Sequence, residues 1–255
     1  MTNATTPDFT AALARLRDAQ KGTKGAPAYS RFINREAGRV LAAAAFTANL
    51  TPNQVTAVSV VFTFGGIGLI ATAPPSPLLG LAVAVALVLG YALDAADGQL
   101  ARLRGGGTPE GEWLDHVVDS IKISALHLAV LIALYRHFDV ATEFLLVPLG
   151  FHLVAAVAFF TMILNEQLRL RHTPPGRVAG ETGSSPVRSL LVVPTDYGVL
   201  CLLFLTLGFS RVFPIGYAAL FAANAAFLAA ALVKWYKDVS ALGRPGTAPE
   251  DQHTS

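Results

Sequence analysis

Charged residues and cysteine are both scarce in this chain of 255 residues. Asp, Glu, Lys and Arg together make up 14% of it, against about 25% in an ordinary soluble domain. Disordered chains and coiled coils carry far more charge, so both classes are excluded. The single cysteine, Cys201, cannot form a disulfide within the chain, which excludes a disulfide-stabilised secreted scaffold.

Apolar residues make up 53% of the chain, with a mean hydropathy of +0.51, and they are gathered into six runs with little or no charge. A membrane-spanning helix needs about 20 such residues, so each run is a candidate span and the six leave no room for a second globular domain. The predicted spans are Val55–Ala73, Leu78–Leu93, Trp113–Leu134, Val140–Leu164, Leu190–Phe209 and Phe213–Trp235. The sequence therefore predicts an all-α integral membrane protein with six transmembrane helices.

A further helix is predicted ahead of the first span, at about residues 28–46. Its apolar residues, among them Phe32, Ile33 and Val40, alternate with basic residues such as Arg35. This pattern is typical of an amphipathic helix that lies in the membrane interface. The alternative is a helix in the aqueous phase.

The basic residues predict how the chain is oriented. Most of the nineteen Lys and Arg residues precede the first span or follow the second, fourth and sixth spans. By the positive-inside rule, both termini are then cytoplasmic. We expect one membrane domain at residues 28–240, between a flexible N-terminal segment at 1–27 and a flexible tail at 241–255. Within the N-terminal segment, residues 9–17 could form one or two amphipathic turns.

Four carboxylates stand where the membrane boundary makes charge costly. Asp94 and Asp97 end the second span, and Asp115 and Asp119 begin the third. Each pair shares one helical face, and the short connection through Gly105–Gly107 would bring the two faces together. Converging carboxylates stay ionised only beside cations, and oxygen-only ligation suits Mg²⁺ or Mn²⁺, with Ca²⁺ as a further option. The sequence predicts a site for two divalent ions, as used for displacement at phosphorus.

Small and basic residues continue the same face beyond Asp94. Gly98 and Ala101 would let a nucleotide or diphosphate approach the backbone closely, and Arg102 could donate two parallel hydrogen bonds to a phosphate. Loop carboxylates beside an ordinary glycine turn would explain any one of these residues. That alternative does not explain why the acidic, small and basic residues all lie on the same helical face.

The whole pattern resembles the signature of the CDP-alcohol phosphotransferase family, also called the CDP-alcohol phosphatidyltransferase family. The matching positions are Asp94, Asp97, Gly98, Ala101, Arg102, Gly111, Asp115 and Asp119. The resemblance extends over about residues 28–240 and implies transfer of a phosphoalcohol from a CDP-linked donor to a hydroxyl, with release of CMP. It further implies that the four aspartates hold two metal ions and that Asp119 is the base. Gly98, Ala101 and Arg102 would contact the CDP part.

The segment before the first span has two interpretations. Thr51 suits a helix N-cap ahead of a proline, which is a purely structural role. The family often has a similar Thr-Pro-Asn segment near the nucleotide, so Thr51, Asn53 and Thr56 are also candidates for binding the cytidine diphosphate.

Other polar residues are candidates for binding the acceptor. Arg188 and Arg171 lie in the basic connection between the fourth and fifth spans, which positive-inside topology alone would also explain. Family members with phosphorylated acceptors carry basic residues in this region. Lys122 shares the acidic face and could offset the carboxylates or meet an acceptor phosphate. Asp196 could bind acceptor hydroxyls or pair with an arginine.

Together these features predict a phospholipid-synthesis enzyme of the bacterial inner membrane, with its active site facing the cytoplasm. We expect it to transfer a phosphatidyl group from CDP-diacylglycerol to a polar alcohol or alcohol phosphate, of the inositol phosphate or glycerol phosphate type. One alternative is transfer from CDP-choline or CDP-ethanolamine to diacylglycerol. Another is a cation transporter, which clustering of the acids at one end disfavours. Nucleic-acid binding has no support, and the small residues of the spans would allow a homodimer.

Overall fold

The computed structural model describes residues 8–18, 27–172 and 193–242. All regular structure in these ranges is helical, which confirms the predicted all-α class. The longer helices are α1 (Phe9–Asp18), α2 (Arg35–Thr47), α3 (Pro52–Thr72), α4 (Pro77–Leu103), α5 (Pro109–His137), α6 (Leu146–His172), α8 (Tyr197–Leu203) and α9 (Val212–Leu242). The short turns are a π-helical turn η1 (Ser30–Asn34), continuous with α2, and the 3₁₀ turns η2 (Thr142–Leu145), η3 (Val193–Thr195) and η4 (Phe204–Thr206).

Five helices are long and apolar enough to span a membrane, where the sequence predicts six spans. They are α3, α4, α5, the continuous helix Thr142–His172, and α9. The predicted fifth span corresponds to a shorter apolar helix, Tyr197–Thr206. Residues 190–192, with which the predicted span begins, fall outside the described part. Ten helical residues cover about 15 Å, roughly half of a hydrocarbon core about 30 Å thick.

Polar caps determine where the spans adjoining the aspartates begin. The side chain of Thr51 caps α3 in a reciprocal capping box with Gln54. Ser76 and Thr108 accept hydrogen bonds from backbone N–H groups in the first turns of α4 and α5. A proline follows each cap at a position where its missing N–H costs nothing.

Small residues let α3 and α4 pack closely along their length. The Ser59 hydroxyl donates to the Gly90 carbonyl at 2.8 Å. A Cβ at Gly90 would collide with the Thr63 hydroxyl. Since apolar burial drives helix association weakly in lipid, close backbone approach of this kind is what holds such helices together.

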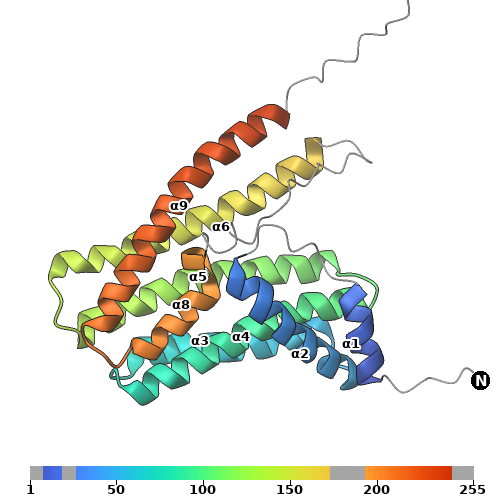
Figure 1. Ribbon diagram of the computed structural model, residues 1–255, viewed down its shortest axis with the longest axis horizontal. Helices are drawn as coiled ribbons and strands as arrows, with labels where there is room; N and C mark the ends of the chain where they lie inside the picture. Colours follow the sequence, from blue (N-terminus) through green and yellow to red (C-terminus); the bar gives the residue numbers. More distant parts are fainter. Residues whose placement is uncertain (1–7, 19–26, 173–192, 243–255) are drawn as a thin grey trace, which may run out of the picture.

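Helices α1 and α2, together with η1, form a second packing layer across α4 (Figure 1). The exposed side chains of Phe32, Ile33 and Val40 line the outer face of η1 and α2, whereas Ala42 is buried against the bundle. Helix α1 lies in the N-terminal segment for which we expected flexibility. It packs on α2 through buried apolar residues and contacts the end of α4, and it lies where residues 9–17 were expected to form amphipathic turns.

Helices α6 and α9 run side by side and extend beyond the rest of the bundle at their C-terminal ends (Figure 1). Only 11% of the α6 span and 17% of the α9 span are buried within the chain, against 39% for α3 and α5. Few residues of these two spans are therefore fully buried by the described part of the chain, which leaves surface for lipid or another protein.

Candidate functional site

The structure brings the aspartates of α4 and α5 together, as their spacing predicts. Gly105 and Gly106 have φ angles of +103° and +127° in the turn between the two helices, a conformation that favours glycine. One carboxylate oxygen from each of Asp94, Asp115 and Asp119 lies within 4.8 Å of the other two. Three hard oxygen ligands at this spacing can hold a divalent cation.

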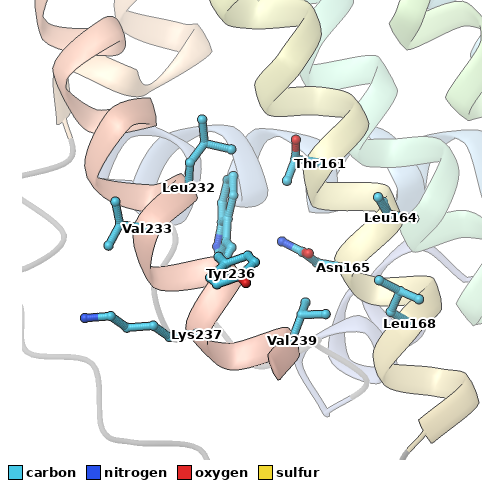
Figure 2. A pocket seen from close by; sticks show the side chains of 10 residues that line it. Thr161, Leu164, Asn165, Leu168, Leu232, Val233, Tyr236, Lys237 and Val239 are labelled. Atoms are coloured by element: carbon cyan, nitrogen blue, oxygen red, sulfur yellow. The ribbon is translucent and has the colours of Figure 1, made fainter. Parts of the chain in front are cut away.

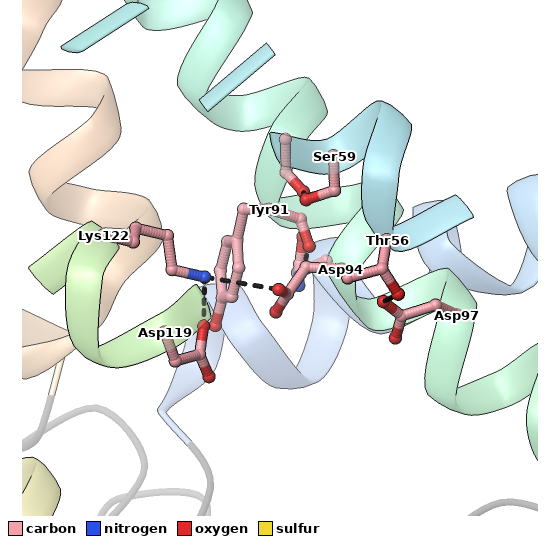
Figure 3. A network of polar contacts seen from close by, with 9 residues as sticks. Thr56, Ser59, Tyr91, Asp94, Asp97, Asp119 and Lys122 are labelled. Atoms are coloured by element: carbon pink, nitrogen blue, oxygen red, sulfur yellow. Dashed lines mark hydrogen bonds and ion pairs between the residues drawn. The ribbon is translucent and has the colours of Figure 1, made fainter. Parts of the chain in front are cut away.

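The fourth aspartate, Asp97, is held in place by α3. Its side chain is buried and accepts a hydrogen bond from the Thr56 hydroxyl at 2.6 Å. Thr56 is itself buried, and its hydroxyl also contacts the Pro52 carbonyl oxygen at 3.1 Å. Figure 3 shows this pair beside the other aspartates. The sequence suggested Thr56 as a nucleotide contact; here it orients a carboxylate of the site.

A buried lysine lies among the carboxylates. The Lys122 ammonium forms an ion pair with Asp119 and lies 3.3 Å from Asp94 Oδ1 (Figure 3). It also lies 5.6 Å from the centre of the Tyr197 ring. Lys122 thus bridges α5 to α4 and supplies one positive charge against the cluster. A single lysine cannot balance four ionised carboxylates.

A pocket of about 240 Å³ adjoins the aspartates. Asp94, Asp97, Asp115, Gly98 and Arg102 all line it. A Cβ added at Gly98 would meet nothing closer than Arg102 Nη1 at 3.7 Å, so this glycine leaves the pocket wall open and is not needed for helix packing. The pocket combines oxygen ligands for a cation with a guanidinium group for an anion.

Other predicted nucleotide contacts lie around this pocket and do not line it. Ala101 is partly buried on α4, and Thr51 serves as the α3 cap. Asn53 is exposed at the start of α3, and its Oδ1 lies 3.6 Å from where a Cβ of Gly111 would be. The starts of α3 and α5 are therefore neighbours at the end of the bundle that carries the aspartates.

A larger cavity of about 590 Å³ lies between the C-terminal halves of α6 and α9 (Figure 2). Its walls are mainly apolar, with Leu164, Leu232 and Tyr236 among them. Among the described residues, none that lines it is a carboxylate. The carboxylate ligands that suit a divalent cation lie at the smaller pocket.

A family model of CDP-alcohol phosphatidyltransferases matches residues 49–236. The chain belongs to this family. The match includes all four aspartates and both faces of the pocket on α4 and α5, and it identifies the chain as a CDP-alcohol phosphotransferase.

Two crystal structures of phosphatidylinositol phosphate synthase (PgsA1) from Mycobacterium tuberculosis are similar to the chain, each with a TM-score of 0.45. The complex with manganese and citrate is 23% identical and covers 77% of this chain and 87% of the other. The form with CDP-diacylglycerol bound is 22% identical, and the match covers 80% of this chain and 94% of the other. No match was found among curated protein sequences.

The acceptor candidates of this CDP-alcohol phosphatidyltransferase are dispersed. Asp196 is 2% exposed, and its carboxylate accepts hydrogen bonds from Ser30. It also caps α8 by accepting a hydrogen bond from the Gly198 N–H. Arg171 is exposed in the last turn of α6, and Arg188 lies outside the described residues. Of the four candidates, Lys122 is the one that the structure places among the aspartates.

Three pocket residues escaped the sequence analysis as site residues. Arg35, Ala95 and Gln99 line the pocket with the family motif. Ala95 and Gln99 are separated by one turn on α4, so a helical projection beside the motif could have found them. Arg35 is the first residue of α2, and nothing local in the sequence indicates that α2 crosses α4 at this point.

Proposed function

We propose that the protein transfers the phosphatidyl group of CDP-diacylglycerol to the hydroxyl of a polar alcohol or alcohol phosphate, with release of CMP. One observation carries the proposal: in a chain of this family, three aspartate oxygens within 4.8 Å of one another adjoin a pocket lined by Arg102 and the open wall at Gly98. The pocket can thus receive a cation and an anionic group side by side.

Two divalent ions, Mg²⁺ or Mn²⁺, fit the donor set. Asp94, Asp97, Asp115 and Asp119 offer oxygen ligands alone, which hard cations prefer. Lys122 offsets one of the four carboxylate charges, so within the described residues of the cluster three negative charges still need compensation. The ions would supply Lewis acidity toward the phosphate oxygens.

Residues of the chain bind the donor and accept the proton of the acceptor. Gly98 leaves room for the nucleotide beside α4, and Arg102 binds and neutralises phosphate oxygens. Asp119 accepts the proton of the acceptor hydroxyl while the oxygen of that hydroxyl attacks the phosphorus that carries the lipid. A new P–O bond forms, the P–O bond to CMP breaks, and CMP leaves with those electrons.

For the acceptor we propose a phosphorylated alcohol, bound with the help of Lys122, Arg171 and Arg188. Lys122 lies in the cluster, Arg171 is in the last turn of α6, and Arg188 follows α6 in the sequence. The contacts of Asp196 favour a structural role instead, because both of its oxygens are already bonded within the protein.

We further propose that the enzyme lies in the bacterial plasma membrane, with six spans, an interfacial α2, cytoplasmic termini and the active site at the cytoplasmic face. The distribution of Lys and Arg and the exposed apolar face of α2 support this arrangement. The largely unburied spans of α6 and α9 support a homodimer as well. Light scattering of the purified protein in detergent would measure its mass.

The decisive experiment measures CMP release by the purified protein with CDP-diacylglycerol and Mg²⁺. The acceptors are inositol phosphate, glycerol phosphate, inositol, serine and glycerol, each tested separately. We expect release that depends on a phosphorylated acceptor and falls by about 10³-fold in Asp119→Asn, which loses a base and a metal ligand. The matched control is Glu112→Gln, an exposed carboxylate on the same helix.

Other outcomes would revise the proposal. Activity with an unphosphorylated acceptor alone would remove the phosphate-binding role of the basic residues. Silence with all five acceptors, together with activity on CDP-choline and diacylglycerol, would establish the reverse choice of partners. No CMP from any pairing would contradict enzymatic transfer, and cation transport would then be tested.

A further inference from the structure

Three arginines follow one another at four-residue intervals along η1 and α2, and they have different surroundings. The Arg31 guanidinium lies 5.1 Å from the centre of the Phe32 ring. Arg39 pairs with Glu36 on the same helix. Arg35, between them, lines the pocket that contains the aspartates. The interfacial helix therefore presents one of its basic residues to the candidate active site.

A close contact between α2 and α4 fixes the position of Arg35. A Cβ on Gly38 would lie 2.9 Å from both Ala95 Cβ and Gln99 Nε2, so only glycine allows this approach without a shift. The Gln99 amide, 5% exposed, donates to the Arg35 carbonyl at 3.1 Å. The backbone that carries Arg35 is thus bonded directly to the helix that carries the motif.

The helix is also held on the other side of Arg35. The Ser30 hydroxyl and N–H donate to the Asp196 carboxylate at 2.8 Å each, and the hydroxyl lies 2.6 Å from Tyr91 Oη. The Asn34 amide reaches the Tyr91 carbonyl at 3.3 Å. Because Arg35 lies between two anchored points, its place at the pocket is built into the fold.

Charge indicates what Arg35 is there to bind. Arg35 and Arg102 line the same pocket and are close enough for their positive charges to repel each other. A guanidinium binds phosphate oxygens through two parallel hydrogen bonds, so two of them match a diphosphate, which has two sets of such oxygens.

We propose that Arg35 binds the diphosphate of the CDP-linked donor together with Arg102, so that the interfacial helix contributes part of the nucleotide pocket. This inference rests on the proposed function, since it takes a cytidine diphosphate as the ligand. It adds to the family motif a binding residue that lies outside the matched residues 49–236.

The test compares the binding of CDP by the full chain and its variants in detergent, by calorimetry with Mn²⁺ present. We expect Arg35→Gln to bind CDP about tenfold to a hundredfold more weakly, since a hydrogen bond to a charged group contributes on that scale. Arg35→Lys keeps the charge but loses the planar fork, so its affinity should fall between the two. Arg39→Gln, one turn further along, should bind CDP like the unaltered chain.

A second measurement separates binding from general damage to the site. Mn²⁺ binding without nucleotide, followed by electron paramagnetic resonance, should not weaken in Arg35→Gln or Arg35→Lys. Unchanged CDP affinity in both variants, or an equal loss in Arg39→Gln, would overturn the role of Arg35. So would loss of Mn²⁺ binding in parallel with CDP. Failure of the unaltered chain to bind CDP at all would instead overturn the proposed function.

Discussion

The carboxylate of Asp196 accepts two hydrogen bonds of 2.8 Å from Ser30, one from its N–H and one from its hydroxyl. The two residues are 166 positions apart in the chain. Asp196 also caps α8 through the Gly198 N–H at 3.1 Å. One buried carboxylate therefore fixes the start of α8 and the start of η1 at the same time.

Replacing Asp196 by Ala should destabilise the protein. The change leaves buried donors of Ser30 and Gly198 without acceptors, at a cost of about 2 to 4 kcal/mol. Thermal unfolding in detergent should then show a melting temperature lower by roughly 5 °C or more. Asp238→Asn is the control, because Asp238 pairs with Arg169 and Lys234 at the surface and should shift the melting temperature little. Equal melting temperatures for Asp196→Ala and the unaltered chain would show that these bonds contribute nothing.

The hydroxyl of Thr56 should be needed for activity, because it orients Asp97. Thr56→Val keeps the shape of the side chain but removes the 2.6 Å hydrogen bond to the buried carboxylate. We expect CMP release to fall by about tenfold or more, on the scale of one lost hydrogen bond to a charged group. Thr56→Ser restores the hydroxyl and should recover most of the rate. If the Val and Ser variants have the same rate, the hydroxyl has no part in the site.

Gly98 should tolerate a methyl group but not a larger side chain. A Cβ there has no atom nearer than Arg102 Nη1 at 3.7 Å, so Gly98→Ala should fold and melt like the unaltered chain. Gly98→Leu would project into the pocket of about 240 Å³ and should weaken CDP binding by at least tenfold, with little change in melting temperature. Calorimetry and thermal unfolding of both variants test this, and tight CDP binding by Gly98→Leu would place the nucleotide elsewhere.

Removing divalent metal should stop CMP release, because the cluster of carboxylates would then lack most of its compensating charge. EDTA should abolish the reaction, and Mg²⁺ or Mn²⁺ should restore it. Asp115→Asn should raise the Mn²⁺ concentration needed for half-saturation by about tenfold, as seen by electron paramagnetic resonance. Glu110→Gln, in the first turn of the same helix, is the control. Full activity in EDTA would rule out a metal requirement.

The part of the site that the sequence predicts depends on local geometry. Asp94 and Asp97 share a face of α4, Asp115 and Asp119 share a face of α5, and a short glycine turn leaves little choice about how the two faces meet. Helix periodicity and loop length are enough for that inference. The same reasoning predicts the all-helical class, because long apolar runs in a membrane must satisfy their backbone hydrogen bonds internally.

Contacts between distant segments could not be predicted in this way. The side chain of Arg35 reaches the pocket because Gly38 lets α2 cross α4 closely, and no periodicity encodes which helix α2 will cross. The partner of Asp196 is likewise set by the assembled fold. Thr56 was assigned to the nucleotide because its motif precedes the first span, while its bond to Asp97 depends on the register of α3 against α4.

The predicted fifth span contains a helix whose ends hydropathy does not indicate. Within the described part of the run Leu190–Phe209, α8 begins after the Asp196 cap and the helix ends near Gly208. A Cβ at Gly208 would collide with the backbone at Ser76 and Pro77, so the chain passes tightly against the start of α4 there. The composition of a segment indicates whether it can lie in lipid. It does not indicate where contacts with neighbouring segments end the helix.

Helix α1 supports the C-terminal end of α4 mechanically. Arg15 donates to the Leu103 carbonyl at 3.2 Å, and Ala12 and Leu16 are buried beside it. Leu103 is the last residue of α4 and directly follows Arg102. Trimming the first eighteen residues, or fusing a bulky tag close to them, would therefore loosen the helix end that carries Arg102, which lines the pocket. An affinity tag is better placed at the other terminus.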